Sequence, residues 1–95
     1  MKQGRELDKC IALDVLALTH ENGFYVELDC PHYSTDIRDA WEVVDYLDLF
    51  LDNVLYQEPI TGEWVIEGME GSDLFIHGKS PAHVICLAAL KVKGL

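Results

Sequence analysis

The chain has 95 residues, of which 49% are apolar and 25% are charged, and its formal net charge at pH 7 is −10. A chain of this length and composition sustains one hydrophobic core, which excludes an intrinsically disordered tail and predicts a single domain over residues 1–95. Direct binding to nucleic-acid phosphates is also excluded, because 17 acids outnumber seven Lys and Arg residues and no basic cluster offsets the repulsion.

The first predicted element is a helix over residues 5–19. Its apolar residues recur every three or four positions, which places four of them on one helical face: Leu7, Ile11, Val15 and Leu18. Asn22-Gly23 is typical of a helix end, because glycine readily adopts the left-handed conformation found there. Residues 24–28 have the composition of a strand, and either a short edge strand or an ordered loop fits them, because Cys30-Pro31 closes the segment.

A second helix is predicted to begin at Ser34 or Thr35, whose hydroxyl can accept a hydrogen bond from a free N–H of the first turn. Asp36 and Asp39 would then lie in that turn, where the helix dipole favours negative charge. One arc of the helix is apolar, with Ile37, Ala40, Trp41, Val44 and Leu47, and the acids occupy the opposite side. We expect the helix to end between residues 47 and 51.

Three later segments have strand character. Residues 53–58 are a candidate strand, and a turn follows at Pro59 to Gly62. Residues 63–67 and 73–77 are better candidates, joined as a hairpin through 68–71. In the first strand of this hairpin, alternate residues face opposite sides, as expected for a sheet covered on one face: Trp64 and Ile66 on one side, Glu63 and Glu67 on the other.

The last predicted helix has the clearest start in the sequence. Ser80 is the expected N-cap, and Pro81 stands at the first helical position, where its missing N–H does no harm. Residues 82–90 are apolar around nearly the whole circumference, so either another helix or another chain must cover the side away from the sheet. This predicts a symmetric homodimer with the last helix or the sheet edge in the interface, and the candidate interface residues are Val84, Leu87 and Ala88.

The order of these elements predicts an α+β domain in which three helices pack on a small antiparallel sheet of three to four strands. The sequence also resembles the phage ABA sandwich domain family. The resemblance rests on Gly4-Arg5-Glu6-Leu7-Asp8, on Tyr33-Ser34-Thr35-Asp36 with Ala40-Trp41, on Trp64-x-Ile66, and on Ser80-Pro81 with Ile85-Cys86-Leu87-Ala88-Ala89-Leu90. It implies an α-β-α layered sandwich of phage or prophage origin and implies no reaction. Where the family tends to place Gly-Trp, this chain has Ala17-Leu18.

The sequence favours no catalytic or cofactor site. The possible metal ligands match no known metal-binding spacing: Cys30, His32, His77, His83 and Cys86. The candidate nucleophiles have no base and orienting acid near them in sequence: Ser34, Ser72, Ser80 and the three cysteines. We therefore expect no enzyme activity, no metal and no cofactor. An odd number of widely spaced cysteines and the absence of a membrane span or signal peptide predict a reduced protein in the cytoplasm of a bacterial host.

The expected function is that of a non-enzymatic phage accessory protein that binds a host or phage protein. One alternative is a small-ligand protein that sequesters a nucleotide used in host defence. Its candidate anion site combines the start of the second helix with a nearby base, namely Ser34, Thr35 and Arg38. Another alternative is an acidic mimic of DNA, suggested by the helix carboxylates of Asp36, Asp39, Glu42 and Asp45.

Overall fold

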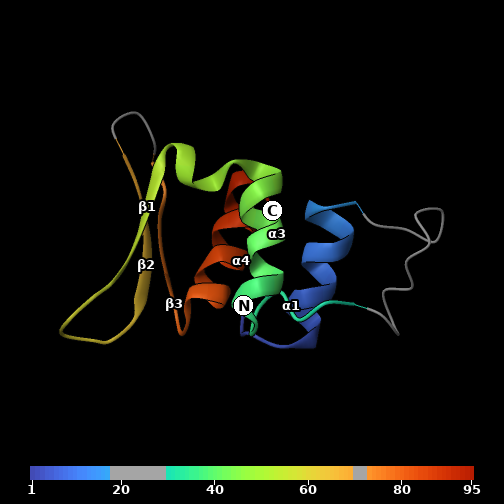
Figure 1. Cartoon of the computed structure of the whole chain (residues 1–95), viewed down its shortest axis with the longest axis horizontal. Helices are drawn as coiled ribbons and strands as arrows, with labels where there is room; N and C mark the ends of the chain where they lie inside the picture. Colours follow the sequence, from blue (N-terminus) through green and yellow to red (C-terminus); the bar gives the residue numbers. More distant parts are fainter. Residues whose placement is uncertain (18–29, 70–72) are drawn as a thin grey trace.

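The computed structural model describes residues 1–17, 30–69 and 73–95 (Figure 1). Helix α1 (Arg5–Cys10) continues into a π-helical turn, η1 (Ile11–Val15), and α3 (Ile37–Leu47) continues into a 3₁₀ turn, η3 (Leu49–Leu51). Strands β1 (Asn53–Gln57), β2 (Trp64–Gly68) and β3 (Phe75–Gly78) precede the last helix, α4 (Pro81–Val92). The first helix ends at Val15, earlier than the predicted range of 5–19, and Ala17 follows in the left-handed conformation with φ 54°. Asn22-Gly23 and the weak strand at 24–28 lie outside the described residues.

The three strands form one antiparallel sheet in the order β1-β2-β3. In its central row Leu55, Ile66 and Ile76 lie side by side and face α4. The predicted α+β class is therefore confirmed, and the hairpin of β2 and β3 is the one expected from the alternation of residues 63–67 and 73–77.

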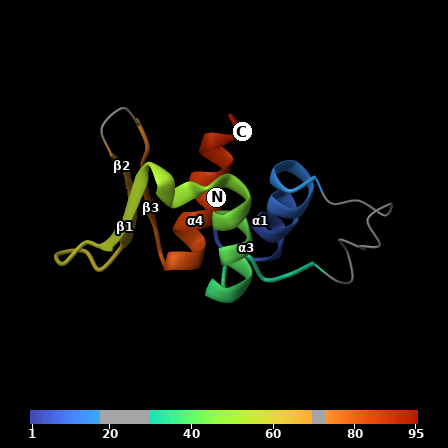
Figure 2. The same ribbon diagram turned by 45° about the horizontal axis from the view of Figure 1, so that its top comes forward.

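The layers follow a different order from the α-β-α sandwich that the family name implies. The sheet is the outer layer, α4 lies directly behind it, and α3 and α1 lie beyond α4 (Figures 1 and 2). No helix in the described part of the chain covers the outer face of the sheet. The helices lie on one side of the sheet because α4 is apolar around its circumference and must be covered on both sides. The sheet covers one side of α4, and α3 and η1 cover the other.

The predicted cap of α4 is confirmed. The Ser80 hydroxyl accepts a hydrogen bond from the backbone N–H of His83 at 3.0 Å, and Pro81 opens the helix. Most of the helix is buried, namely Ala82, His83, Val84, Ile85, Cys86, Ala88 and Ala89. α4 is thus the centre of the core, and Gly78 at the end of β3 lies against its first turn.

The start of α3 differs from the prediction. Its N-cap is Asp36, whose carboxylate accepts a hydrogen bond from the backbone N–H of Arg38 at 2.9 Å. Ser34 is unavailable as a cap because its hydroxyl accepts a hydrogen bond from the Gly4 N–H at 2.8 Å and lies 3.1 Å from the Gly4 carbonyl. The helix ends at Leu47, within the expected interval, and Asp48 follows in the left-handed conformation with φ 50°.

A buried carboxylate joins the N-terminal helix to the turn before α3. Asp8 is fully buried, and its Oδ1 accepts a hydrogen bond from the Ser34 N–H at 2.7 Å. Its Oδ2 accepts a second hydrogen bond from the Arg5 guanidinium at 2.9 Å. Arg5 also donates to the Cys30 carbonyl at 2.6 Å, so one ion pair holds two segments that are distant in sequence.

Tyr33 is buried, and among the described residues its hydroxyl has no hydrogen-bond partner. Burial raises the pKa of this hydroxyl well above its ordinary value. Because a buried hydroxyl without a partner loses its hydration without compensation, we expect Tyr33→Phe to leave the free energy of unfolding unchanged or to raise it by about 1 kcal/mol. Urea denaturation followed by circular dichroism measures this, and a loss above about 1 kcal/mol would mean that the hydroxyl is bonded in solution.

Candidate functional site

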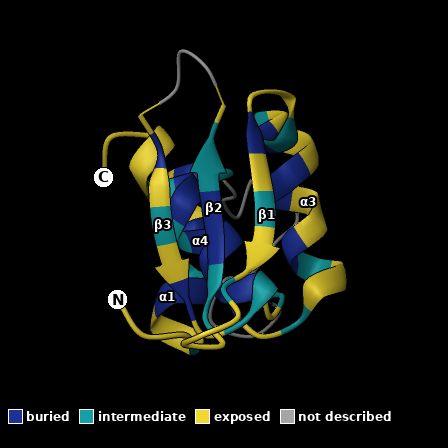
Figure 3. Ribbon diagram, turned by 90° about the vertical axis from the view of Figure 1, so that its left-hand side faces the viewer, coloured by how far each residue is buried: buried dark blue, intermediate teal, exposed yellow. Residues whose placement is uncertain are grey.

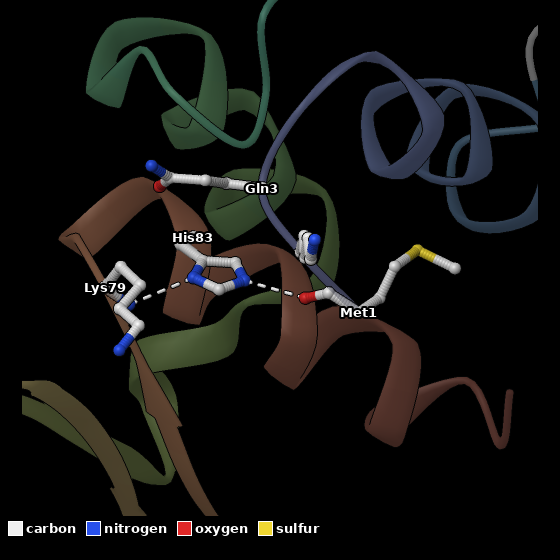
Figure 4. A pocket seen from close by; sticks show the side chains of 5 residues that line it. Met1, Gln3, Lys79 and His83 are labelled. Atoms are coloured by element: carbon white, nitrogen blue, oxygen red, sulfur yellow. Dashed lines mark hydrogen bonds between the residues drawn. The ribbon is translucent and has the colours of Figure 1, made fainter.

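A cleft of about 580 Å³ lies between the N-terminal segment and the start of α4, lined by Met1, Lys2, Gln3, Lys79 and His83 (Figure 4). His83 is buried in its wall. Its Nδ1 accepts a hydrogen bond from the Lys79 backbone N–H at 2.9 Å, so the ring proton lies on Nε2, which donates to the Met1 carbonyl at 2.9 Å. Both ring nitrogens are engaged, and His83 therefore joins two segments and offers no free base.

Two of the three cysteines occupy positions unsuited to nucleophilic chemistry. Cys30 and Cys86 are buried, and burial raises the pKa of both thiols. A thiol with a raised pKa is a weak nucleophile, because the thiolate is the reactive form. Over the described ranges, no three His, Cys, Asp or Glu side chains lie close enough together to hold a metal ion. The described helices are also too short, or too polar, to cross a membrane.

The predicted anion site consists of residues that already have partners within the protein. The Ser34 hydroxyl is bonded to Gly4. Arg38 is exposed, and its Nη2 lies 3.4 Å from the Asp36 Oδ2. The hydrogen bonds with Arg38 lower the pKa of Asp36. Thr35 is exposed, and its N–H donates to the His32 carbonyl at 3.2 Å. Anion binding by Ser34, Thr35 and Arg38 stays a prediction.

The predicted interface residues of α4 lie mainly in the core of this chain. Val84 and Ala88 are fully buried, whereas Leu87 is half-buried. Since α3 and η1 already cover the side of α4 away from the sheet, the helix has an intramolecular cover and does not need a second chain for that purpose. The homodimer itself stays a prediction.

The outer face of the sheet also exposes apolar side chains, and no described helix covers it (Figure 3). The strand register places six side chains on it in two rows, which we call the outer sheet face: Val54, Glu67 and Phe75 in one row, and Tyr56, Val65 and His77 in the other. Of these side chains, Phe75 is 56% exposed, Val54 44% and Tyr56 38%. Val65, on the central strand of this face, is completely buried, although no helix in the described part of the chain covers it.

Contacts within the outer sheet face hold its aromatic side chains in place. The Tyr56 hydroxyl donates to the Glu67 Oε1 at 2.8 Å, and the rings of Phe75 and His77 meet edge to face with centroids 5.0 Å apart. The sequence prediction placed Glu67 on the outward side of β2. It missed that Tyr56 and Phe75 share this side, although the same alternation in β1 and β3 indicates it.

The negative charge of the protein is concentrated in the same part of the chain. Residues 39–78, which form most of α3 and the whole sheet, contain ten of the 17 acids and none of the seven Lys and Arg residues. The rest of the chain has seven acids and seven bases, which cancel. The whole net charge of −10 therefore belongs to residues 39–78.

Comparison with known proteins identifies the family. No curated protein matches the chain. The fold is similar to the crystal structure of a phage protein from Bacillus cereus ATCC 14579, with a TM-score of 0.74 and 22% sequence identity over 95% of this chain and 90% of that one. The phage ABA sandwich domain matches residues 9–90, which include every described element except part of α1 and the end of α4. The chain therefore belongs to the phage ABA sandwich domain family.

Proposed function

We propose that this phage protein is a non-enzymatic accessory protein that binds a basic protein of the host or the phage through its outer sheet face, in the bacterial cytoplasm. The observation that carries the proposal is the exposure of Phe75, Val54 and Tyr56 on a sheet face that no described helix covers. Exposed apolar surface of this kind, here with the Glu67 carboxylate between Val54 and Phe75 on the central strand, is typical of protein interaction sites.

The composition of the outer sheet face supports protein binding. Aromatic side chains are enriched in interfaces because they bury a large area with few rotatable bonds. Tyr56 and Phe75 are already oriented by Glu67 and His77. The entropy cost of ordering these two side chains on binding is therefore small. Val65, on the central strand of the same face, is completely buried and so is not in contact with water.

Charge determines the kind of partner. The outer sheet face includes Glu67, and the acids Glu58, Glu63 and Asp73 lie in sequence beside its strands. Residues 39–78 contain no Lys or Arg, and Lys79 follows directly after β3. A second copy of the chain would bring the same negative charge against this surface, which disfavours a homodimer here. A basic protein is attracted to it at long range. A nucleic-acid-binding protein, whose basic surface otherwise faces phosphates, is a partner of this kind.

Photo-crosslinking in the host identifies the partner. Benzoylphenylalanine would replace Phe75, and in a matched control it would replace Leu13, which is similarly exposed at 50% but lies in η1. We expect one basic protein to be captured from position 75 and not from position 13. Capture of an acidic protein, of a second copy of this chain, of the same products from both positions, or of nothing would contradict the proposal.

Binding measurements with the purified partner then test the surface itself. We expect Phe75→Thr to weaken the affinity about tenfold or more, because an exposed aromatic anchor is lost while a β-branched residue preserves the strand. Leu13→Gln removes a comparable apolar side chain from η1 and should leave the affinity unchanged. Isothermal titration calorimetry provides the dissociation constants. Equal affinities for wild type and Phe75→Thr would place the binding surface elsewhere.

A further inference from the structure

A second, smaller cleft lies where α3 ends and η3 begins. Its volume is about 240 Å³, and it is lined by Trp41, Val44, Asp45, Asp48, Phe50 and Leu51. We call it the α3 cleft. The rings of Trp41 and Phe50 meet with centroids 5.6 Å apart at an angle of 52°. The Trp41 side chain is 46% exposed and Leu51 is 73% exposed, so the apolar lining of the cleft is open to solvent.

The exposure of Trp41 is unexpected from the helix pattern. The predicted apolar arc of α3 includes Trp41 and Ile37, yet both are exposed, while Val43, outside that arc, is fully buried. The helix therefore turns toward the core through Ala40, Val43 and Val44. This rotation leaves the Trp41 indole ring about half exposed, in contact with the Phe50 ring and beside carboxylates at the surface.

Three properties of the α3 cleft favour a cation. Trp41 and Phe50 provide aromatic faces, which attract cations placed over the ring. The C-terminal end of a helix carries partial negative charge, and α3 ends here at Leu47. Asp45 and Asp48 add two carboxylates, and in the described part of the chain neither of them forms a salt bridge.

We infer that the α3 cleft binds an arginine side chain of the basic partner, an inference that rests on the proposed function and names a contact within it. A guanidinium is flat enough to stack on an indole ring while its N–H groups bond to carboxylates in the ring plane, which a compact ammonium group does less well. The cleft is smaller than the roughly 300–1,000 Å³ of sites for small-molecule ligands, so a single side chain is the fitting occupant.

The position of the α3 cleft connects it to the outer sheet face. η3 leads from α3 directly into β1 (Figure 2). Leu51, which lines the α3 cleft, is three residues before Val54 in β1. η3 and β1 are also in contact. A protein seated on the outer sheet face at β1 therefore has the α3 cleft within reach of its basic side chains.

The test uses defined peptides and does not require the partner. The wild-type protein, labelled with ¹⁵N, would be titrated with acetyl-Gly-Ala-Arg-Ala-Gly-amide, and in parallel with peptides carrying citrulline or lysine in place of arginine. We expect saturable NMR shifts at the Trp41 indole N–H and at the backbone amides of Asp48 and Phe50. The Trp64 indole serves as an internal control and should not move. The neutral citrulline peptide, which has nearly the shape of arginine, should bind at least tenfold more weakly, and the lysine peptide should bind more weakly than arginine.

A pair of double variants separates the cleft from general charge. Asp45→Asn with Asp48→Asn should weaken arginine-peptide binding at least fivefold, and asparagine tolerates the left-handed conformation at position 48. Glu6→Gln with Asp14→Asn removes the same charge from exposed positions in α1 and η1 and should leave binding unchanged. Shifts scattered over all acidic residues, equal binding of the citrulline or lysine peptide, or equal effects of the two double variants would overturn the inference.

The two proposals fail separately. Phe75→Thr should leave arginine-peptide binding at the α3 cleft unchanged, because Phe75 lies on β3 and not in the cleft lining. If the peptide does not bind while crosslinking at position 75 captures a basic partner, the cleft inference is wrong and the proposed function stands. If the arginine peptide binds while crosslinking at position 75 captures no basic partner, the proposed function is wrong and the α3 cleft is still an arginine-binding site.

Discussion

Gly78→Ala is expected to destabilise the protein by about 3 kcal/mol or more, a large part of the roughly 5–15 kcal/mol that holds a small domain folded. A Cβ added at position 78 would lie 2.8 Å from the Val84 backbone nitrogen and 2.9 Å from the Val84 Cα and Cβ. Non-bonded carbon atoms need about 3.5 Å or more. Because two of these three atoms belong to the backbone of α4, relief requires the central helix to move away from β3. Urea denaturation followed by circular dichroism measures the loss.

Gly62→Ala is the matched control for Gly78→Ala. Nothing lies within 4 Å of a Cβ at position 62, but its φ of +76° is strained for alanine, so we expect a loss of about 1 kcal/mol from the backbone alone. The difference between the two variants isolates the steric contact with α4. If Gly78→Ala is no less stable than Gly62→Ala, the close packing of β3 on α4 is not maintained in solution.

Asp8→Ala is expected to lower the free energy of unfolding by about 3 kcal/mol, near the lower end of the range for breaking a buried ion pair, because Arg5 is partly exposed. The buried Ser34 N–H would lose its acceptor, and Arg5 would lose its carboxylate partner. Equilibrium unfolding in urea measures the change. Asp14→Ala removes an exposed carboxylate from the adjacent turn and should change stability by less than about 0.5 kcal/mol.

Asp8→Asn separates the two roles of Asp8. The amide oxygen can still accept the hydrogen bond from Ser34, but the charge that pairs with Arg5 is gone. We therefore expect a stability between those of wild type and Asp8→Ala. If Asp8→Ala behaves like Asp14→Ala, the contact between the N-terminal helix and the turn before α3 contributes nothing to folding.

Features that depend on neighbours in sequence follow from the sequence by itself. Ser80-Pro81 begins a helix because the cap and the proline act within one turn. The alternation in residues 63–67 and 73–77 specifies strands because a pleated chain places successive side chains on opposite sides. The nearly uniform apolar surface of 82–90 likewise requires that α4 be covered on most sides, although the sequence does not say whether a helix of the same chain or a second chain covers it. The concentration of all net charge in residues 39–78 is likewise a property of the sequence.

Features that depend on contacts between distant segments were decided only by the tertiary structure. Asp36 caps α3 in place of the predicted Ser34 or Thr35, and the Ser34 hydroxyl is engaged by Gly4, thirty residues earlier. Trp41 lies at the surface although helical periodicity assigns it to the apolar arc, because the rotation of α3 is set by its packing against α4. The sheet is an outer layer because the helices gather around α4 and leave its far face uncovered. Local propensity acts over a few residues, whereas these outcomes depend on which surfaces meet when the core closes.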